Sequence, residues 1–183
     1  MITFVLGGAK SGKTAFALKY AENLRGFRDY YYLATAQALD EEMKEKIKKH
    51  KEERPSYWKL IEEPLSISHH LEKLSKSLSV ILLDCITLWI SNLLHYERNF
   101  DQETEAFFEV LKAFQAHERS WLILVSNEIG LGIVPENSLA RKYRDLVGYV
   151  NQRISALADE VYFIVAGLSI PLKRSGSSNL GIP

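Results

Sequence analysis

The segment at positions 7–14 has the residue types and the spacing of a phosphate-binding loop. The pattern G-x-x-x-x-G-K-[ST] is matched at every fixed position by Gly7, Gly8, Ala9, Lys10, Ser11, Gly12, Lys13 and Thr14. Such a loop places its backbone N–H groups around the β-phosphate of a nucleotide, and glycine lets the backbone approach closely. Lys13 would contact the β- and γ-phosphates, and Thr14 would ligate Mg²⁺. We therefore predict a nucleoside triphosphate as substrate or ligand.

An acidic residue follows one of the short apolar runs of the chain. The run at 80–83 is followed directly by Asp84. An aspartate in this position is commonly a cap or a turn residue when it stands alone. In a chain that also carries a phosphate loop, we expect Asp84 to hold Mg²⁺ through water beside Thr14. Cys85 comes next, and we interpret it as a small buried side chain because nothing nearby in the sequence would clearly lower its pKa.

A charged helical segment at 40–54 carries a histidine. His50 is predicted to share one helix face with the apolar residues at steps of three and four before it, Leu39, Met43 and Ile47. A lone histidine on such a face is more often a hydrogen-bonded packing residue than a catalyst. Lys51 and Arg54 nevertheless supply cations within one turn, as a phosphate site requires. Neutral imidazole is also a competent nucleophile toward phosphorus, so both interpretations of His50 stay open.

The bulk composition limits the class of protein. The chain has 183 residues, of which 46% are hydrophobic, so it can bury one core and is most simply one domain. Lys plus Arg and Asp plus Glu number 23 each, so no net field favours nucleic acid or a membrane surface. The single cysteine excludes an internal disulfide. With no recognisable signal peptide and no apolar run long enough to span a membrane, we expect a cytoplasmic protein.

Short apolar runs alternate with helical patterns along the chain. We predict strands at 2–6, 30–34, 80–83, 121–125 and 161–165, and a short edge strand at 58–61. A helix should follow the phosphate loop, and another should follow Pro135, where apolar residues recur at three- and four-residue steps. The predicted fold is a single α/β domain at 1–173, similar to phosphate-loop NTPases, with a mostly parallel sheet flanked by helices. Residues 174–183 are predicted to form a loose tail.

The chain resembles the bifunctional adenosylcobinamide kinases and adenosylcobinamide-phosphate guanylyltransferases of cobalamin biosynthesis. The resemblance extends over residues 1–173. The segments that carry it are LGGAKSGKT at 6–14, ATAQALDEEM at 34–43, IKKHKEERPSYWKLIEE at 47–63, LLDCITLWISNLL at 82–94 and the long segment that begins with SNEIGLGIVPEN at 126. The phosphate loop occurs in many families. The spacing of His50, Arg54, Trp58 and Glu62 is far more specific.

The resemblance implies two reactions and a set of site residues. ATP or GTP would phosphorylate a corrinoid substrate, with Lys13 assisting and with Mg²⁺ held by Thr14 and Asp84. His50 would then take GMP from GTP as a covalent intermediate. The guanine nucleotide would contact the phosphate loop and Ala34, Thr35, Ala36, Lys51, Glu52, Glu53, Arg54, Glu62 and Asp84. A homotrimer is also implied.

The corrinoid-binding residues are less well defined. Possible residues of a corrinoid pocket are Glu128, Glu136, Asn137, Arg141 and Arg144. For the two arginines, a solvated helix face is an equally good interpretation.

Two other functional classes fit part of the pattern. A plain small-molecule kinase would explain the phosphate loop and Asp84 but would leave His50 without chemistry. A nucleotide-binding switch would use the same loop to order a segment when the γ-phosphate binds, although a chain of 183 residues leaves no obvious effector domain. His50 is the residue that separates the plain kinase from the two-activity enzyme.

Overall fold

The computed structural model describes residues 1–38, 41, 44, 45, 55–116 and 119–174. The strands of this part of the chain form one seven-stranded sheet. Its order is β3 (Trp58–Glu62), β2 (Asp29–Ala34), β4 (Ser79–Asp84), β5 (Trp121–Asn127), β1 (Ile2–Gly7), β6 (Glu160–Val165) and β7 (Leu168–Lys173). Every neighbouring pair is parallel except β6 with β7.

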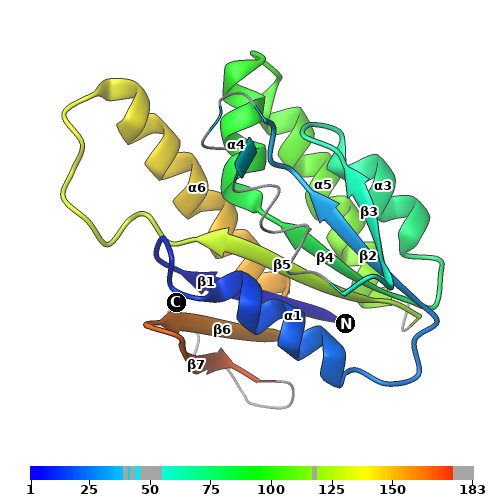
Figure 1. Ribbon diagram of the computed structural model, residues 1–183. Helices are drawn as coiled ribbons and strands as arrows, with labels where there is room; N and C mark the ends of the chain where they lie inside the picture. Colours follow the sequence, from blue (N-terminus) through cyan, green and yellow to red (C-terminus); the bar gives the residue numbers. More distant parts are fainter. Residues whose placement is uncertain (39–40, 42–43, 46–54, 117–118, 175–183) are drawn as a thin grey trace.

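Helices cover both faces of the sheet (Figure 1). Among the described residues, α1 (Lys13–Asn23) alone covers one face, where Ala17 and Ala21 pack against apolar side chains of β1, β4 and β5. The other face is covered by α3 (Ile67–Leu74), α4 (Ile86–His95), α5 (Phe100–Ala116) and α6 (Ser138–Leu157). The central strands therefore carry apolar residues on both faces, as expected for a parallel sheet between helices.

The α/β fold with a mostly parallel sheet is confirmed. The predicted strands correspond to β1, β2, β4, β5 and β6, and the short run at 58–61 forms the edge strand β3. The helices predicted after the phosphate loop and after Pro135 are α1 and α6. The helix predicted over 40–54 lies largely outside the described residues. The boundary at 173 stays a prediction, because residues 175–183 also lie outside them.

Strand β7 was not predicted from the sequence. Pro171 lies within it, and proline removes a ladder donor, so a proline-containing run is a weak strand signal. Its residues are also exposed on both faces, which removes the alternation of buried and exposed side chains that marks most strands. The position of β7 at the sheet edge, paired antiparallel to β6, is one that tolerates proline.

Parallel pairing brings several strand ends to one edge of the sheet. In the register of the sheet, Gly7 at the end of β1 pairs with Asn127, and Asp84 at the end of β4 pairs with Val125. Ala34 at the end of β2 pairs with Asp84. The phosphate loop and the residues after β2, β4 and β5 therefore lie along the same edge.

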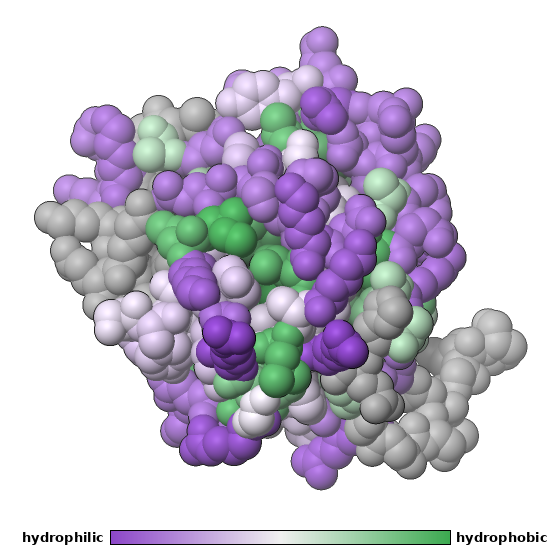
Figure 2. Space-filling view, turned by 90° about the vertical axis from the view of Figure 1, so that its right-hand side faces the viewer, coloured by the Kyte–Doolittle hydropathy of each residue, from purple (hydrophilic) through white to green (hydrophobic). Residues whose placement is uncertain are grey.

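The opposite edge, where the strands begin, faces the viewer in Figure 2. Hydrophilic residues surround a smaller area of apolar ones on this face. No helix in the described part of the chain is both long enough and apolar enough to cross a membrane.

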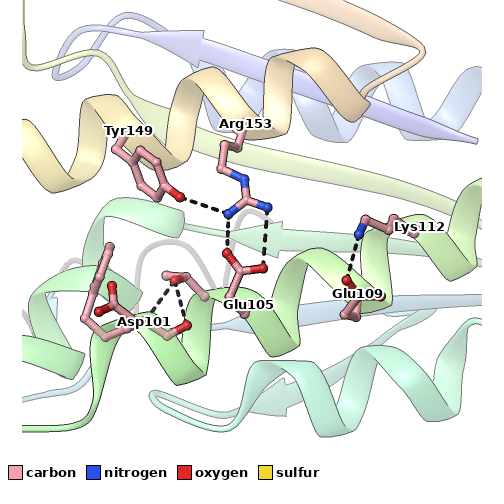
Figure 3. A network of polar contacts seen from close by, with 8 residues as sticks. Asp101, Glu105, Glu109, Lys112, Tyr149 and Arg153 are labelled. Atoms are coloured by element: carbon pink, nitrogen blue, oxygen red, sulfur yellow. Dashed lines mark hydrogen bonds and ion pairs between the residues drawn. The ribbon is translucent and has the colours of Figure 1, made fainter.

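A cluster of polar contacts on the molecular surface connects α6 to α5 (Figure 3). Arg153 of α6 hydrogen-bonds Glu105 of α5, and its guanidinium lies 3.9 Å from the centre of the Phe108 ring. Arg153 also donates to the hydroxyl of Tyr149 at 2.9 Å. Because arginine can stack on an aromatic ring and pair with a carboxylate at once, this side chain links the second half of α6 to α5.

The core beneath α5 supplies a test of the packing. Phe107 is fully buried, with its ring centre 5.1 Å from that of Trp89. Replacing Phe107 with alanine should lower the free energy of unfolding by about 3–5 kcal/mol, because the change leaves a cavity. Urea unfolding followed by circular dichroism measures this value. The exposed Glu109→Ala on the same helix should change it by less than about 0.5 kcal/mol, and equal effects of the two changes would contradict the packing described.

Candidate nucleotide-binding site

The phosphate loop connects β1 to α1 and requires glycine at two positions. Gly12 precedes α1 with a φ of 95°, in the left-handed region that favours glycine. A Cβ atom on Gly7 would lie 2.4 Å from the carbonyl oxygen of Ile164 on β6. The loop is closed by a bond from the N–H of Ser11 to the carbonyl of Gly8. The strand, loop and helix therefore follow one another as the motif predicts.

Lys13 folds back over this loop. Its ammonium group donates a hydrogen bond of 2.6 Å to the carbonyl oxygen of Gly8, and the residue is almost completely buried. Burial lowers the pKa of Lys13 below the ordinary lysine value, and the nearby Cys85 and Asp84 oppose that shift only in part. A cation at this place can exchange its contact with a loop carbonyl for a phosphate oxygen.

Thr14 and Asp84 contact each other although they come from different elements. The hydroxyl of Thr14, in the first turn of α1, donates to Oδ2 of Asp84 at 2.9 Å. A hydroxyl and a carboxylate are the hard oxygen ligands that Mg²⁺ takes directly or through water, together with phosphate oxygens. The donor set thus fits Mg²⁺ bound with a nucleotide. In the part of the chain that is described, no group of three or more His, Cys, Asp or Glu side chains could hold a metal ion alone.

Tyr32 also contacts the carboxylate of Asp84, and the sequence did not predict it as a site residue. Its hydroxyl donates to Oδ2 of Asp84 at 2.7 Å. Tyr32 lies in the middle of an apolar, aromatic strand, where a tyrosine is ordinarily interpreted as a core residue. The available signal was its place on β2, the parallel neighbour of β4, but strand order cannot be read from the local pattern.

Thr35 directly follows β2 and is hydrogen-bonded to the backbone of Asp84 and Cys85. The Thr35 hydroxyl donates to the carbonyl of Cys85 at 2.8 Å and accepts from its N–H at 2.9 Å. The Thr35 N–H donates to the carbonyl of Asp84, and its own carbonyl accepts from Asn92. The hydroxyl, the N–H and the carbonyl of Thr35 are therefore all hydrogen-bonded to other residues of the protein.

Glu62 ends the edge strand and pairs with Ala34 in the register of the sheet. Its side chain is exposed at the same sheet edge as the phosphate loop. The remaining predicted site residues, His50, Lys51, Glu52, Glu53 and Arg54, lie outside the described residues.

Cys85 is buried, as predicted from the sequence. Its sulfur lies 3.0 Å from the hydroxyl oxygen of Thr87, and burial raises the pKa of the thiol to about 11. A thiol with this pKa stays protonated near neutral pH and makes a poor nucleophile. The prediction that Cys85 is a small buried side chain is confirmed.

The loop at 128–137 begins beside the phosphate loop. The N–H of Glu128 donates to the carbonyl of Gly7 at 3.1 Å, and the loop ends at Asn137, whose side chain caps α6 by accepting from the N–H of Ala140. In Figure 1 the loop and the start of α6 project beyond the rest of the molecule.

The two arginines of α6 differ in their surroundings. Arg141 donates to the carbonyl oxygens of Pro135 and Glu136 and so holds the end of this loop. Arg144 lines a shallow hollow of ≈ 580 Å³ between the loop and α6, together with Gly130, Gly132, Val134, Asp145, Gly148, Tyr149 and Gln152. Of the two, Arg144 is thus the one that faces a surface on which a large ligand could rest.

The turn between β6 and β7 supports the phosphate loop from the other side. The N–H of Gly167 donates to the carbonyl of Ser11 at 2.9 Å. Its Cα lies 3.4 Å from where a Cβ on Gly12 would be. This contact also could not be predicted, because β7 itself was not.

The comparisons with known proteins assign the chain to a family. The family model described as "Cobinamide kinase / cobinamide phosphate guanyltransferase" matches residues 3–172. The chain belongs to this family. The family resemblance inferred from the sequence is confirmed, and with it the assignment to a family of enzymes that is described by a kinase and a guanylyltransferase activity.

Two curated relatives in this family match over nearly the whole chain. One is the bifunctional adenosylcobalamin biosynthesis protein CobP of Pseudomonas aeruginosa, 41% identical over 175 residues that span 94% of this chain and 98% of that protein. Another is the protein CobU of Salmonella typhimurium, also named bifunctional, 38% identical over an alignment of 193 positions that covers 94% of this chain and 100% of that protein.

Solved structures share the fold at low sequence identity. One ATPase domain matches with a TM-score of 0.53 and 13% identity, over 97% of this chain and 78% of that one. The flagellar accessory protein FlaH from Methanocaldococcus jannaschii matches with a TM-score of 0.51 and 16% identity, over 95% of this chain and 78% of that one. At these identities, the likeness concerns the fold alone.

The buried thiol at the end of β4 gives a direct test of the geometry at this edge. With a pKa of about 11, roughly one Cys85 thiol in a thousand is ionised at pH 8, and the group is also shielded from reagents. The native protein should therefore react with a thiol reagent such as DTNB at least about a hundred times more slowly than the urea-unfolded chain. Equal rates in the two states would show that Cys85 is accessible and would contradict the structure.

Proposed function

We propose that this protein phosphorylates adenosylcobinamide with ATP or GTP and then transfers GMP from GTP to the product. The product of the second reaction is adenosylcobinamide-GDP, an intermediate in assembly of the cobalamin nucleotide loop. Membership of the family supports both activities. The structural observation that carries the kinase part is the hydrogen bond between Thr14 and Asp84, because it unites a phosphate loop with a carboxylate from another strand.

In the kinase reaction, the substrate hydroxyl oxygen would attack the γ-phosphorus. The bond from that phosphorus to the β–γ bridging oxygen would break, releasing the nucleoside diphosphate. Residues 7–14 would bind the phosphates through backbone N–H groups, and the ammonium of Lys13 would stabilise charge that develops on their oxygens. Thr14 and Asp84 would hold Mg²⁺, which when bound neutralises phosphate charge.

In the second reaction, an imidazole nitrogen of His50 would attack the α-phosphorus of GTP and pyrophosphate would leave. An oxygen of adenosylcobinamide phosphate would then attack the same phosphorus, break the nitrogen–phosphorus bond and free the histidine. This assignment is supported by the family resemblance. His50 must be unprotonated to attack, and a nearby cation such as Arg54 would lower its pKa.

The guanine nucleotide is proposed to contact a set of residues that the family resemblance implies. These are the phosphate loop, Asp84 and Ala34, Ala36, Lys51, Glu52, Glu53, Arg54 and Glu62. Thr35 was predicted as a contact by resemblance. Because its hydroxyl and backbone groups are already bonded, we propose that it acts by positioning its two alanine neighbours.

The corrinoid is proposed to bind near the hollow that Arg144 lines. This hollow lies beside the loop at 128–137, which begins next to the phosphate loop. Large apolar side chains are exposed on this loop and on β7, including Leu131, Ile133 and Leu168. Exposed groups of this kind are common at surfaces that self-associate, which supports the homotrimer implied by the family. We further propose that the enzyme works in the cytoplasm.

Labelling with GTP that is radioactive at the α-phosphate tests this function. The wild-type protein should retain α-label after denaturation, and the label should be acid-labile and alkali-stable, as expected for a phosphorus–nitrogen bond to histidine. γ-Labelled GTP should leave no such label. His50→Ala should lose the α-label and still transfer γ-phosphate to adenosylcobinamide.

Each alternative gives a different result. A plain kinase would show no α-label in protein that binds GTP, and His50→Ala would leave every activity intact. A nucleotide-binding switch would bind GTP tightly and transfer phosphate to no acceptor. A stable α-label that survives in His50→Ala would place the nucleophile elsewhere.

A further inference from the structure

The carboxylate of Asp84 is held by two hydroxyl donors on the same oxygen. Thr14 donates to Oδ2 at 2.9 Å and Tyr32 donates to Oδ2 at 2.7 Å. We propose that Tyr32 is a positioning residue, which fixes the orientation of Asp84 for the binding of Mg²⁺ with the nucleotide. This inference rests on the proposed metal role of Asp84.

The register of the sheet places Tyr32 where its side chain can reach Asp84. Tyr32 on β2 pairs with Leu82 on β4, two residues before Asp84. Residues two apart on a strand share a face, so the side chains of Tyr32, Leu82 and Asp84 lie on one side of the sheet. Tyr32 and Leu82 both belong to the core beneath α1, the helix that carries Thr14. The phenol therefore runs along that face toward the strand end.

The phenol is a rigid donor. Tyr32 is 4% exposed, and its ring packs edge to face against Trp58, with ring centres 6.2 Å apart. A side chain fixed in this way loses little further entropy when its hydroxyl binds a carboxylate. A hydrogen bond from a hydroxyl to an ionised carboxylate is among the stronger ones in proteins. The hydrogen bond from Tyr32 to Asp84 is thus favoured by the packing of the ring as well as by the charge of the carboxylate.

The two bonds to Oδ2 assign different roles to the two carboxylate oxygens. Among the described residues, no donor contacts Oδ1 of Asp84, so this oxygen is the one left for a water molecule on Mg²⁺. The torsion that turns an aspartate carboxylate is broad and poorly defined by itself. Loss of the Tyr32 bond would leave a single donor on Oδ2 and let the carboxylate turn, which would weaken metal binding without altering the phosphate loop.

Tyr30 offers a matched control on the same strand. It lies two residues before Tyr32 on the same face, and its ring also packs edge to face on Trp58, with ring centres 5.5 Å apart. Its hydroxyl, however, donates to the carbonyl of Leu24 at 3.2 Å. Tyr30→Phe therefore removes a hydroxyl from the same aromatic cluster without touching Asp84.

The test measures binding of α,β-methylene GTP, which cannot guanylylate the protein, by calorimetry at a series of Mg²⁺ concentrations and in EDTA. Tyr32→Phe should raise the Mg²⁺ concentration for half-maximal enhancement of binding about tenfold, as is typical when a partner of a metal ligand is removed. Its affinity in EDTA should match that of wild type, because the phosphate loop is unaltered. Tyr30→Phe should leave the Mg²⁺ dependence unchanged.

A double variant shows whether Tyr32 acts through Asp84. In an Asp84→Asn background, Tyr32→Phe should produce no further change in Mg²⁺ dependence. An equal loss of affinity with and without Mg²⁺, an unchanged Mg²⁺ dependence, or a full effect in the Asp84→Asn background would each overturn the positioning role. If Asp84→Asn itself left the Mg²⁺ dependence unchanged, the proposed metal role of Asp84 would fail together with this inference.

Discussion

The parallel pairing of the central strands is the constraint on which the candidate site depends. Because β5 pairs in parallel with both β4 and β1, the strand ends that carry Asp84 and Gly7 lie at the same edge of the sheet. The turn at Gly12 then starts α1 at that edge and brings Thr14 within hydrogen-bond distance of Asp84. Residues 70 positions apart in sequence thus form one polar site.

Support for this site comes from three directions. On the β2 side, Thr35 is bonded to the backbone of Cys85 and Asn92 is bonded to Thr35. On the β6 side, the turn at Gly167 is bonded to the phosphate loop. Beneath the carboxylate, Tyr32 donates to the oxygen that Thr14 also contacts. Buried and mutually satisfied polar groups of this kind specify one arrangement, because any unpaired member would be costly.

Local signals sufficed for the elements and for part of the site. The strand and the helix that flank the phosphate loop, the strand before Asp84 and the amphipathic helix α6 are each predicted by a short stretch of sequence, and each is confirmed as an element. Tyr32 and Gly167 could not be found in this way, because their roles depend on which strands are neighbours. The identity of the reactions depended on longer motifs, since a phosphate loop alone occurs in many families. The proposed role of His50 as the nucleophile rests on the sequence and on the family alone.

A crystal structure of the protein with Mg²⁺ and α,β-methylene GTP would test the central claim most directly. We predict that the triphosphate occupies the loop at 7–14, with the Lys13 ammonium moved from the Gly8 carbonyl to a phosphate oxygen. Mg²⁺ should then lie between the hydroxyl of Thr14 and a water molecule on Asp84. A nucleotide bound elsewhere, with Lys13 still on Gly8 and no metal beside Thr14, would contradict the account.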